Sequence, residues 1–152
     1  MRLLVLHVDR FEYTVTEPTR SPLREPVAHA SHAVSEALVA LTSVEREDEA
    51  APARVAQLAA QELERLARQL GVRQLVLHPF AHLFGTVAAP TVAREVLDAV
   101  REGLQGAGFE VHRSPFGWFT RWNLQTKGHP LSRVGRIVRA TPTAEDAPAS
   151  SS

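Results

Sequence analysis

Hydrophobic and polar positions over the first part of the chain predict two strands and a long loop. Residues 2–8 are almost continuously apolar, which is typical of a central strand buried on both faces. Over residues 11–16 apolar and polar side chains alternate, and this predicts a half-buried strand that pairs back on the first after a tight turn at Asp9-Arg10. Residues 17–35 contain three prolines and no clear period, so we expect a long surface loop there.

Farther along the chain the hydrophobic period becomes that of a helix. The apolar run 37–44 predicts another buried strand. Residues 52–70 place apolar side chains on one helical face, with Pro52 at a first helical position and Gly71 as the stop. The same spacing predicts a second helix over 91–105. Further strands are expected at 74–77, 109–113, 118–125 and 134–139.

This order of elements predicts an α/β fold, with a mixed β-sheet and two helices packed on one of its faces. At 152 residues the chain has the length of one ordinary domain, which we place at residues 1–140. The remaining residues, 141–152, are mostly Pro, Ser, Thr and Ala, and we expect them to form a disordered tail.

The composition excludes several kinds of chemistry and location. The chain has no cysteine, which rules out disulfide scaffolds, thiolate zinc sites and cysteine nucleophiles. No apolar run approaches the roughly 20 residues that cross a bilayer, and the apolar start of the chain is too short for a signal peptide. We therefore expect a soluble, cytoplasmic protein that does not associate with a membrane.

The formal net charge is zero at pH 7, but the basic residues are unevenly distributed. Residues 111–144 include no acidic residue, and their basic residues are Arg113, Arg121, Lys127, Arg133, Arg136 and Arg139. Such a segment indicates a local anionic partner. It also contains both tryptophans of the chain, and basic residues interleaved with aromatic ones suit a splayed nucleotide end. The alternative is that these aromatic side chains belong to the core.

Packing does not explain three short segments, at 78–82, 114–119 and 127–131. His78 and His82 are four residues apart, but Pro79 disfavours a helix through them and no carboxylate is close in sequence, so we predict neither a metal nor a cofactor. The competing interpretation of each histidine is a loop residue satisfied by hydrogen bonds. Ser114 does not lie in a nucleophile-elbow sequence. Gly117 has no Cβ and allows its backbone to approach a ligand, although it also suits a simple turn.

With the start of the chain, these segments resemble the N-terminal editing domain of archaeal-type threonyl-tRNA synthetases, whose fold is that of D-aminoacyl-tRNA deacylases. The resemblance runs from Met1 to about Arg139. Its motifs occur in the family's order at 3–9 with Glu12-Tyr13, at 43–45, at 78–83, at 115–117 and at 127–131. The resemblance implies an aminoacyl-tRNA deacylase that removes serine wrongly attached to threonine tRNA. Because 152 residues do not hold an aminoacylation core, we expect a freestanding deacylase that acts in trans.

The resemblance also implies the residues of the site. The family holds the terminal adenosine and the amino acid largely through main-chain groups, which correspond by position to Val44, Pro79, Ala81, Phe116 and Gly117. His82 lies beside them in sequence and is expected to be catalytic. Contacts to the phosphates of the tRNA are expected from Arg113, Lys127 and Arg136.

The sequence departs from the family at three polar positions. Thr120 replaces a lysine implicated in positioning or activating the attacking water, Phe119 replaces a tyrosine, and Arg133 replaces a glutamate. Thr120 and Arg121 are therefore the remaining candidates for catalysis at this point of the chain. Adjacent strand residues point to opposite faces, so Arg121 reaches the site of Thr120 only if a bulge intervenes. Its guanidinium stays protonated, and its role would be to orient a phosphate or the ester carbonyl.

Two alternative functions remain open. Loss of the family's lysine, tyrosine and glutamate suits a non-catalytic module that binds aminoacyl-tRNA or an aminoacyl-adenosine. The shared fold also admits a D-aminoacyl-tRNA deacylase. The resemblance further implies a homodimer, and the first strand is too apolar for an exposed edge.

Overall fold

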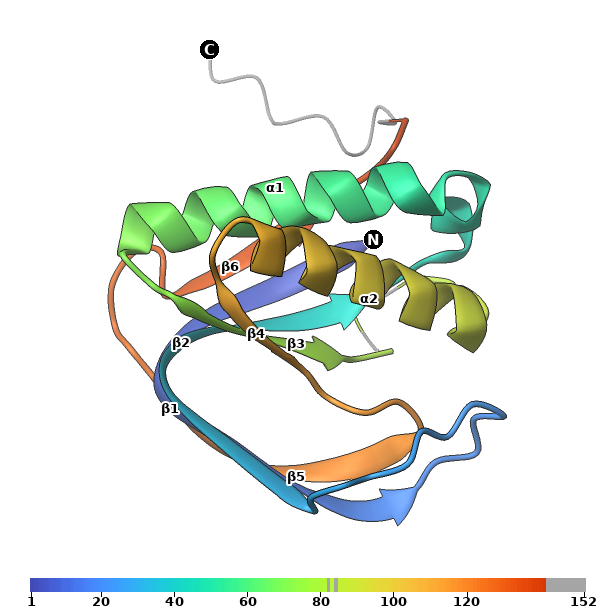
Figure 1. The fold of residues 1–152 in the computed structure, drawn as a ribbon, viewed down its shortest axis with the longest axis horizontal. Coiled ribbons are helices and arrows are strands. Elements are labelled where there is room, and N and C mark those ends of the chain that lie inside the picture. The colour runs from blue at the N-terminus through green and yellow to red at the C-terminus, as the bar shows by residue number, and fades with distance from the viewer. Residues whose placement is uncertain (82, 84, 142–152) are drawn as a thin grey trace.

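In the part of the chain that the structure describes, residues 1–81, 83 and 85–141, six strands form one curled sheet and two long helices cover one of its faces (Figure 1). This structure is a computed structural model. Its strands are β1 (Arg2–Pro18), β2 (Ser31–Ser43), β3 (Gln74–Pro79), β4 (Glu110–Arg113), β5 (Trp118–Thr126) and β6 (Arg133–Ile137). Its helices are the 3₁₀ helix η1 (Arg46–Ala50) and the α-helices α1 (Pro52–Leu70) and α2 (Pro90–Gly106).

The sheet is mixed, as the sequence predicts. Its strand order is β4-β3-β2-β1-β5, and β6 pairs with β1 beside this path. β1 is antiparallel to β2, β5 and β6, whereas β3 runs parallel to both of its neighbours, β2 and β4. Helices α1 and α2 lie side by side on one face of the sheet (Figure 1). The predicted α/β class, with both helices on one face, is confirmed.

The expected turn at Asp9-Arg10 is wrong, because β1 continues through this point as one long strand. Its pairing with β2 runs from Arg2 opposite Ser43 to Thr14 opposite Ser31. The pairing with β5 shifts register between Val8 and Arg10, so the polar residues mark an irregularity of the ladder, not a reversal of the chain. Because β2 begins at Ser31, the predicted long loop at 17–35 shortens to residues 19–30.

Both helices occur where their apolar spacing and end signals predict them. Helix α1 begins at Pro52 and ends before Gly71, whose φ of 68° gives the left-handed conformation that glycine adopts without steric cost. The buried side chains of α1 and α2 face the sheet and complete one hydrophobic cluster with β1, β2 and β3. A second cluster lies within the curl and includes Phe11, Tyr13 and Val39. A cavity lies between the two clusters. Leu97 of the first cluster and Trp122, which packs against the second, both line it.

Strand β1 lies in the interior of the sheet, with β2 on one side and β5 and β6 on the other. The apolar first strand therefore gives no reason to expect a dimer, because β1 is not an edge strand. Among the described residues, no helix combines the length and the apolarity that crossing a membrane requires. The predicted disordered tail lies outside the described residues, except for Thr141.

Candidate functional site

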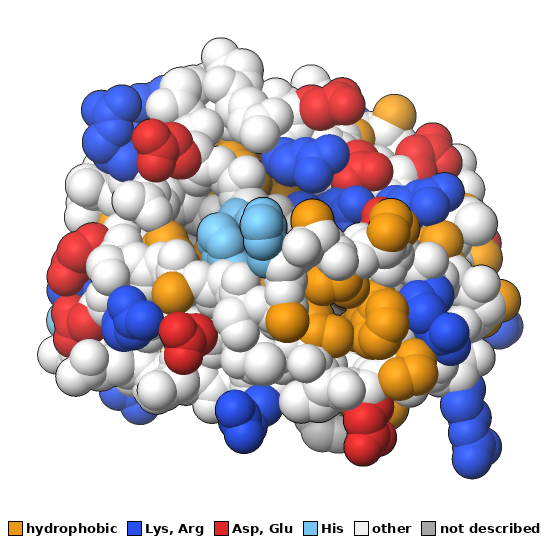
Figure 2. Space-filling view, turned by 60° about the horizontal axis from the view of Figure 1, so that its bottom comes forward, with side chains coloured by type: hydrophobic (Ala, Val, Ile, Leu, Met, Phe, Trp, Pro, Cys, Tyr) orange, Lys and Arg blue, Asp and Glu red, His pale blue; other side chains and the backbone are white. Residues whose placement is uncertain are grey.

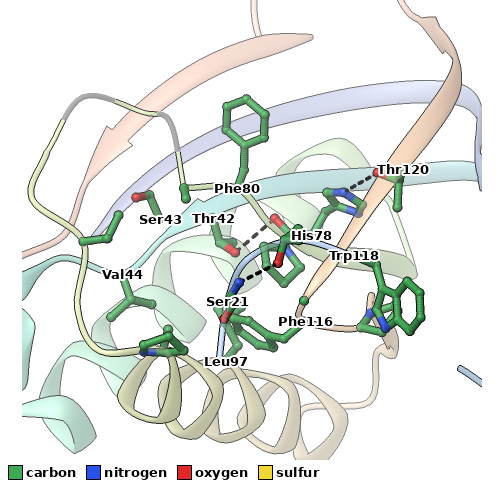
Figure 3. Close-up of a pocket in the computed structure, with 18 of the residues that line it drawn as sticks. Ser21, Thr42, Ser43, Val44, His78, Phe80, Leu97, Phe116, Trp118 and Thr120 are labelled. Carbon is green, nitrogen blue, oxygen red and sulfur yellow. Dashed lines mark hydrogen bonds between the residues drawn. The ribbon is translucent and has the colours of Figure 1, made fainter. Parts of the chain in front are cut away.

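A cavity of about 450 Å³ opens at the carboxyl ends of β2 and β3 (Figure 3). The start of α2, strand β5 and the segment between β1 and β2 complete its walls. All the substrate-binding residues expected from the sequence line it, namely Val44, Pro79, Ala81, Phe116 and Gly117. Thr120, one of the expected catalytic residues, also lines it. The structure thus brings together two of the three motifs that packing did not explain.

Backbone hydrogen bonds fix the floor of the cavity. Strands β2 and β3 pair in parallel up to Thr42 and Pro79, and the Thr42 hydroxyl donates to the carbonyl oxygen of His78 at 3.1 Å. The N–H of Phe80 donates to the carbonyl of Thr42 at 2.8 Å. The N–H of Ala88 donates to the Val44 carbonyl at 2.9 Å. These bonds place the main chain of both strand ends against the cavity.

The segment 19–27 docks on the turn that precedes β5. The N–H of Thr19 donates to the Gly117 carbonyl at 2.9 Å, and the N–H of Phe116 donates to the Glu25 carboxylate at 2.8 Å. The Trp118 indole donates to the Glu25 carbonyl at 2.8 Å. This segment therefore forms a built wall of the cavity, although the sequence showed only an irregular, proline-rich loop.

Gly117 is required by this docked segment, and the expectation that its missing Cβ leaves space for a ligand is wrong. Its φ is +90°, and a Cβ there would lie 2.4 Å from the carbonyl oxygen of Leu23 and 2.7 Å from Cα of Arg24. Both are backbone atoms, so they cannot give way as a flexible side chain would. The space beside Gly117 is filled by the protein itself.

Arg113, an expected tRNA contact, lies in a buried ion-pair cluster. Its side chain is 8% exposed and binds the Glu25 carboxylate through two nitrogens at 2.6 and 2.7 Å. Its Nε donates to Asp98 of α2 at 2.6 Å. Burial raises the pKa of Glu25, but hydrogen bonds from Arg113 and the Phe116 N–H outweigh it and hold that pKa below its ordinary value. Arg113 anchors the segment 19–27 and presents no free face to a phosphate.

Lys127 and Arg136, the other expected phosphate contacts, each form an ion pair with a carboxylate. Lys127 pairs with Asp9 and Glu36, and Arg136 pairs with Glu62 at 2.8 Å. Both remain partly exposed, and neither lines the cavity. Arg121 is exposed on β5 and does not line the cavity either, which follows from strand alternation beside Thr120. The expected catalytic role of Arg121 is therefore not compatible with its position.

A hydrogen-bonded group of uncharged side chains lies at the β3–β5 wall (Figure 3). The His78 Nδ1 is 2.8 Å from the Ser114 hydroxyl, and its Nε2 is 3.4 Å from the Thr120 hydroxyl. The Trp122 indole donates to the Thr120 hydroxyl at 2.7 Å. Burial, with a smaller contribution from His112, lowers the pKa of His78 to about 4, so its ring is neutral at pH 7.

Sequence reasoning missed the importance of His78 in this group. One of its two interpretations placed His78 in a loop, but the residue belongs to β3 and its side chain is buried. The only signal was a histidine at the end of an apolar run, and its partners are 36 and 42 residues away. The expected catalytic residue His82 lies outside the described residues.

The cavity is uncharged as far as the structure describes it. None of its described lining residues is Asp, Glu, Lys or Arg; the polar side chains are those of Thr19, Ser21, Thr42, Ser43, His78, Trp118, Thr120 and Trp122. Within residues 1–81, 83 and 85–141, no group of three or more His, Cys, Asp or Glu is arranged to hold a metal ion. Hydrophobic side chains gather around a hollow on this side of the molecule, with charged residues on the surrounding surface (Figure 2). The cavity therefore suits a ligand held by main-chain groups and neutral donors.

Comparison with known proteins identifies related sequences over nearly the whole chain. The model of the archaea-specific editing domain of threonyl-tRNA synthetase matches residues 1–138. Threonine–tRNA ligase of Methanosarcina acetivorans is 38% identical over 149 residues, which are 97% of this chain and 23% of that protein. The enzyme of Methanopyrus kandleri is 38% identical over 146 residues, which are 96% of this chain and 23% of that protein. The chain thus spans about a quarter of the length of these relatives.

A similarity to a solved structure concerns the fold. The structure titled c-Myc DNA Unwinding Element Binding Protein superposes with a TM-score of 0.54 at 18% identity. The match covers 94% of this chain and 100% of the other. The two chains therefore share their overall fold.

Proposed function

This chain belongs to the family of archaea-specific editing domains of threonyl-tRNA synthetase, and we propose that it hydrolyses the ester that joins serine to the 3′ end of threonine tRNA. The observation that carries the proposal is the cavity. Residues from distant parts of the chain, which the family resemblance assigns to the site, line one space of about 450 Å³. A cavity of this size falls within the range that binds small ligands such as an aminoacyl-adenosine.

The chemistry of the substrate explains why such a hydrolase is needed. Serine is threonine without one methyl group, and a binding pocket discriminates a group of that size by only about 1–3 kcal/mol. A synthetase site built for threonine therefore also admits serine. A second site that is too small for threonine corrects the error by hydrolysis.

The walls of the cavity suit this selection. Main-chain segments at Val44, Pro79 and Phe116 are held by backbone hydrogen bonds, so they yield little to an additional methyl group. Hydrolysis then depends on the position of the ester and of the attacking water, with assistance from the neighbouring ribose hydroxyl.

Deacylation time courses test the proposal directly. The 152-residue chain is added to threonine tRNA charged with L-serine, with L-threonine or with D-serine. We expect the L-seryl ester to be hydrolysed above the buffer rate and faster than the threonyl ester, which also supports action in trans. No acceleration for any of these substrates overturns the hydrolase. A preference for D-serine instead supports the D-aminoacyl-tRNA deacylase.

A second candidate function is a binding module without turnover. Its supporting observation is that Thr120 occupies the position of the family's lysine in a cavity whose described lining carries no charged side chain. This module binds an amide-linked seryl-adenosine analogue, which calorimetry measures, and leaves seryl-tRNA intact. Replacing Phe119→Tyr, Thr120→Lys and Arg133→Glu together then creates activity. Continued inactivity of that triple variant, if it binds the analogue, contradicts this candidate.

The remaining expectations concern assembly and location. A homodimer follows from the family resemblance alone, since β1 is not an exposed edge. Light scattering at micromolar concentration tests it, and a monomeric mass contradicts it. A cytoplasmic location is expected for a protein that acts on tRNA during translation.

A further inference from the structure

The Thr120 hydroxyl has one hydrogen-bonding position left for a ligand. A hydroxyl has one proton to donate and two lone pairs that accept. The Trp122 indole can only donate, and it occupies one lone pair of the Thr120 hydroxyl at 2.7 Å. The Thr120 hydroxyl oxygen lies 3.4 Å from the His78 Nε2, to which it can donate its proton. Because Thr120 lines the cavity, its second lone pair is available to a donor group of a bound ligand.

Both ring nitrogens of His78 have a hydroxyl partner. The Nδ1 lies 2.8 Å from the Ser114 hydroxyl, and the Nε2 lies 3.4 Å from the Thr120 hydroxyl. A neutral imidazole carries its proton on one nitrogen and accepts at the other. In the tautomer with the proton on Nδ1, the ring donates to the Ser114 oxygen, and the unprotonated Nε2 accepts from Thr120.

The surroundings of His78 keep its ring neutral and fixed. Phe11, Tyr13 and Trp122 all contact the ring edge to face or at a steep angle. The titratable groups near it are Tyr13 from β1 and His112 from β4, and β5 contributes only the uncharged Thr120 and Trp122. No carboxylate within the described residues pairs with His78, so nothing there favours the imidazolium.

We propose that Thr120 is a catalytic residue, which receives a proton from the attacking water, and that His78 is the positioning residue that takes the Thr120 proton. The arrangement has the order of a hydroxyl, a base and a group that orients the base. It extends from Thr120 through His78 to Ser114. This inference rests on the proposed hydrolase function. It gives Thr120 and His78 the role in activating water that the family resemblance implies for a lysine at the position of Thr120.

The step balances without any further reactant. The water oxygen bonds to the ester carbonyl carbon, and the carbonyl electron pair moves to its oxygen. One water proton passes to the Thr120 hydroxyl as the Thr120 proton passes to His78 Nε2. When the carbonyl re-forms, the bond to the ribose oxygen breaks, and the proton returns from His78 through Thr120 to that oxygen. Free serine and uncharged tRNA result.

Single-turnover deacylation of seryl-tRNA tests the pair, with protein in excess over tRNA. Thr120→Val keeps the shape of the side chain and removes its hydroxyl, and we expect a rate loss of about 10²-fold or more. Thr120→Ser keeps the hydroxyl and is expected to retain most of the rate. The affinity for the amide-linked seryl-adenosine analogue should not change in either variant. Thr14→Val, on β1 outside the cavity, is the matched control and should have the parental rate.

The positioning role of His78 is tested by the pH dependence of the same rate. In the parent we expect an acid limb as the pH falls toward 4, because a protonated His78 cannot accept the Thr120 proton. His78→Gln should be slow and lack this limb, with circular dichroism checking that it is folded. Ser114→Ala provides a second variant in case His78→Gln does not fold, and it should lower the rate without affecting analogue affinity.

The outcomes separate this inference from the proposed function. If the parent hydrolyses seryl-tRNA and Thr120→Val does so equally well, the catalytic pair is wrong and the function stands. If Thr120→Val weakens analogue binding as much as it slows hydrolysis, Thr120 only binds the substrate, and the pair is again wrong. If the parent does not hydrolyse seryl-tRNA, both the function and the pair are overturned.

Discussion

Arg113 and Ser114 are adjacent in the chain, but they belong to two regions with opposite electrostatic character. Arg113 is the centre of a charged cluster with Glu25 and Asp98, which fastens the segment 19–27 and helix α2 to the end of β4. Ser114 belongs to an uncharged chain of hydrogen bonds that reaches the cavity through His78. The charges of this region therefore hold the walls of the site, while its interior stays neutral.

This difference explains why the basic residues of 111–144 do not indicate which side chains line the cavity. Four of its basic residues, Arg113, Lys127, Arg136 and Arg139, have carboxylate partners among the described residues. Those carboxylates come from other parts of the chain, so the excess of positive charge along the segment does not persist in three dimensions. The polar side chains among the described residues that line the cavity are instead hydroxyl, imidazole and indole groups, which add no charge to a sequence count.

The largest effect is expected from breaking the charged cluster. Arg113→Met leaves the largely buried Glu25 carboxylate without its partner, and we expect a loss of unfolding free energy near the lower end of the about 3–5 kcal/mol for a fully buried pair. Urea denaturation at pH 7 measures this cost. Arg121→Met, at an exposed position of β5, is the matched control, with a change within about 0.5 kcal/mol. Equal stability of the two variants contradicts the anchoring role.

A smaller loss of stability is expected from adding a Cβ where the anchored segment meets the turn. Gly117→Ala and Gly108→Ala both place alanine at a positive φ, of +90° and +98°, which costs about 1–2 kcal/mol. Only Gly117→Ala also clashes, with the backbone of Leu23 and Arg24, whereas the space beside Gly108 is open. Gly117→Ala should therefore have the lower melting temperature and the weaker analogue binding. Identical melting temperatures indicate that the segment does not dock there.

The buried neutral histidines of the uncharged region should make the stability of the protein depend on pH. His78 and His112 have pKa values lowered to about 4, mainly by burial, against 6.5 for the ordinary group. The unfolded chain therefore binds more protons between pH 6.5 and 4, so stability is full above this window and falls as the pH decreases through it. The slope is at most about 1.4 kcal/mol per pH unit for each proton. Urea denaturation at several pH values should give a shallower slope for His78→Phe than for the parent; equal slopes contradict a buried neutral His78.

The smallest effect is expected at the partly exposed ion pairs. Arg136→Gln breaks the contact with Glu62, and exposed pairs contribute about 0–1 kcal/mol to stability. If Arg136 also contacts a phosphate of the tRNA, the variant weakens tRNA binding more at low salt than at high salt. Fluorescence titration with tRNA at two salt concentrations measures this, and a salt-independent change rules out a phosphate contact by Arg136.

The sequence predicted those parts of the fold that depend on local signals. Both helices have clear apolar stripes, and α1 also has end signals at Pro52 and Gly71. Both form within a residue of the expected bounds. The turn at Asp9-Arg10 was wrong because two polar residues are typical of a turn, whereas long-range pairing with β2 keeps β1 extended there. Local patterns carry no information about such pairing.

The site was predicted only as far as the family resemblance reaches. The main-chain positions at Val44, Pro79 and Phe116 do line one cavity. The resemblance could not indicate the role of Gly117, because Leu23 and Arg24 approach it from a segment without any regular pattern. The group formed by His78, Ser114 and Thr120 is likewise assembled from β3, β5 and the residue after β4.

We propose that this uncharged cavity hydrolyses a seryl ester without the lysine that the family resemblance implies at the position of Thr120. Single-turnover deacylation of seryl-tRNA by the parent chain and by Thr120→Lys tests it most directly. We predict that the parent accelerates hydrolysis over the buffer rate and that Thr120→Lys is not required for activity. A parent that binds the seryl-adenosine analogue but leaves seryl-tRNA at the buffer rate, beside an active Thr120→Lys variant, contradicts the claim.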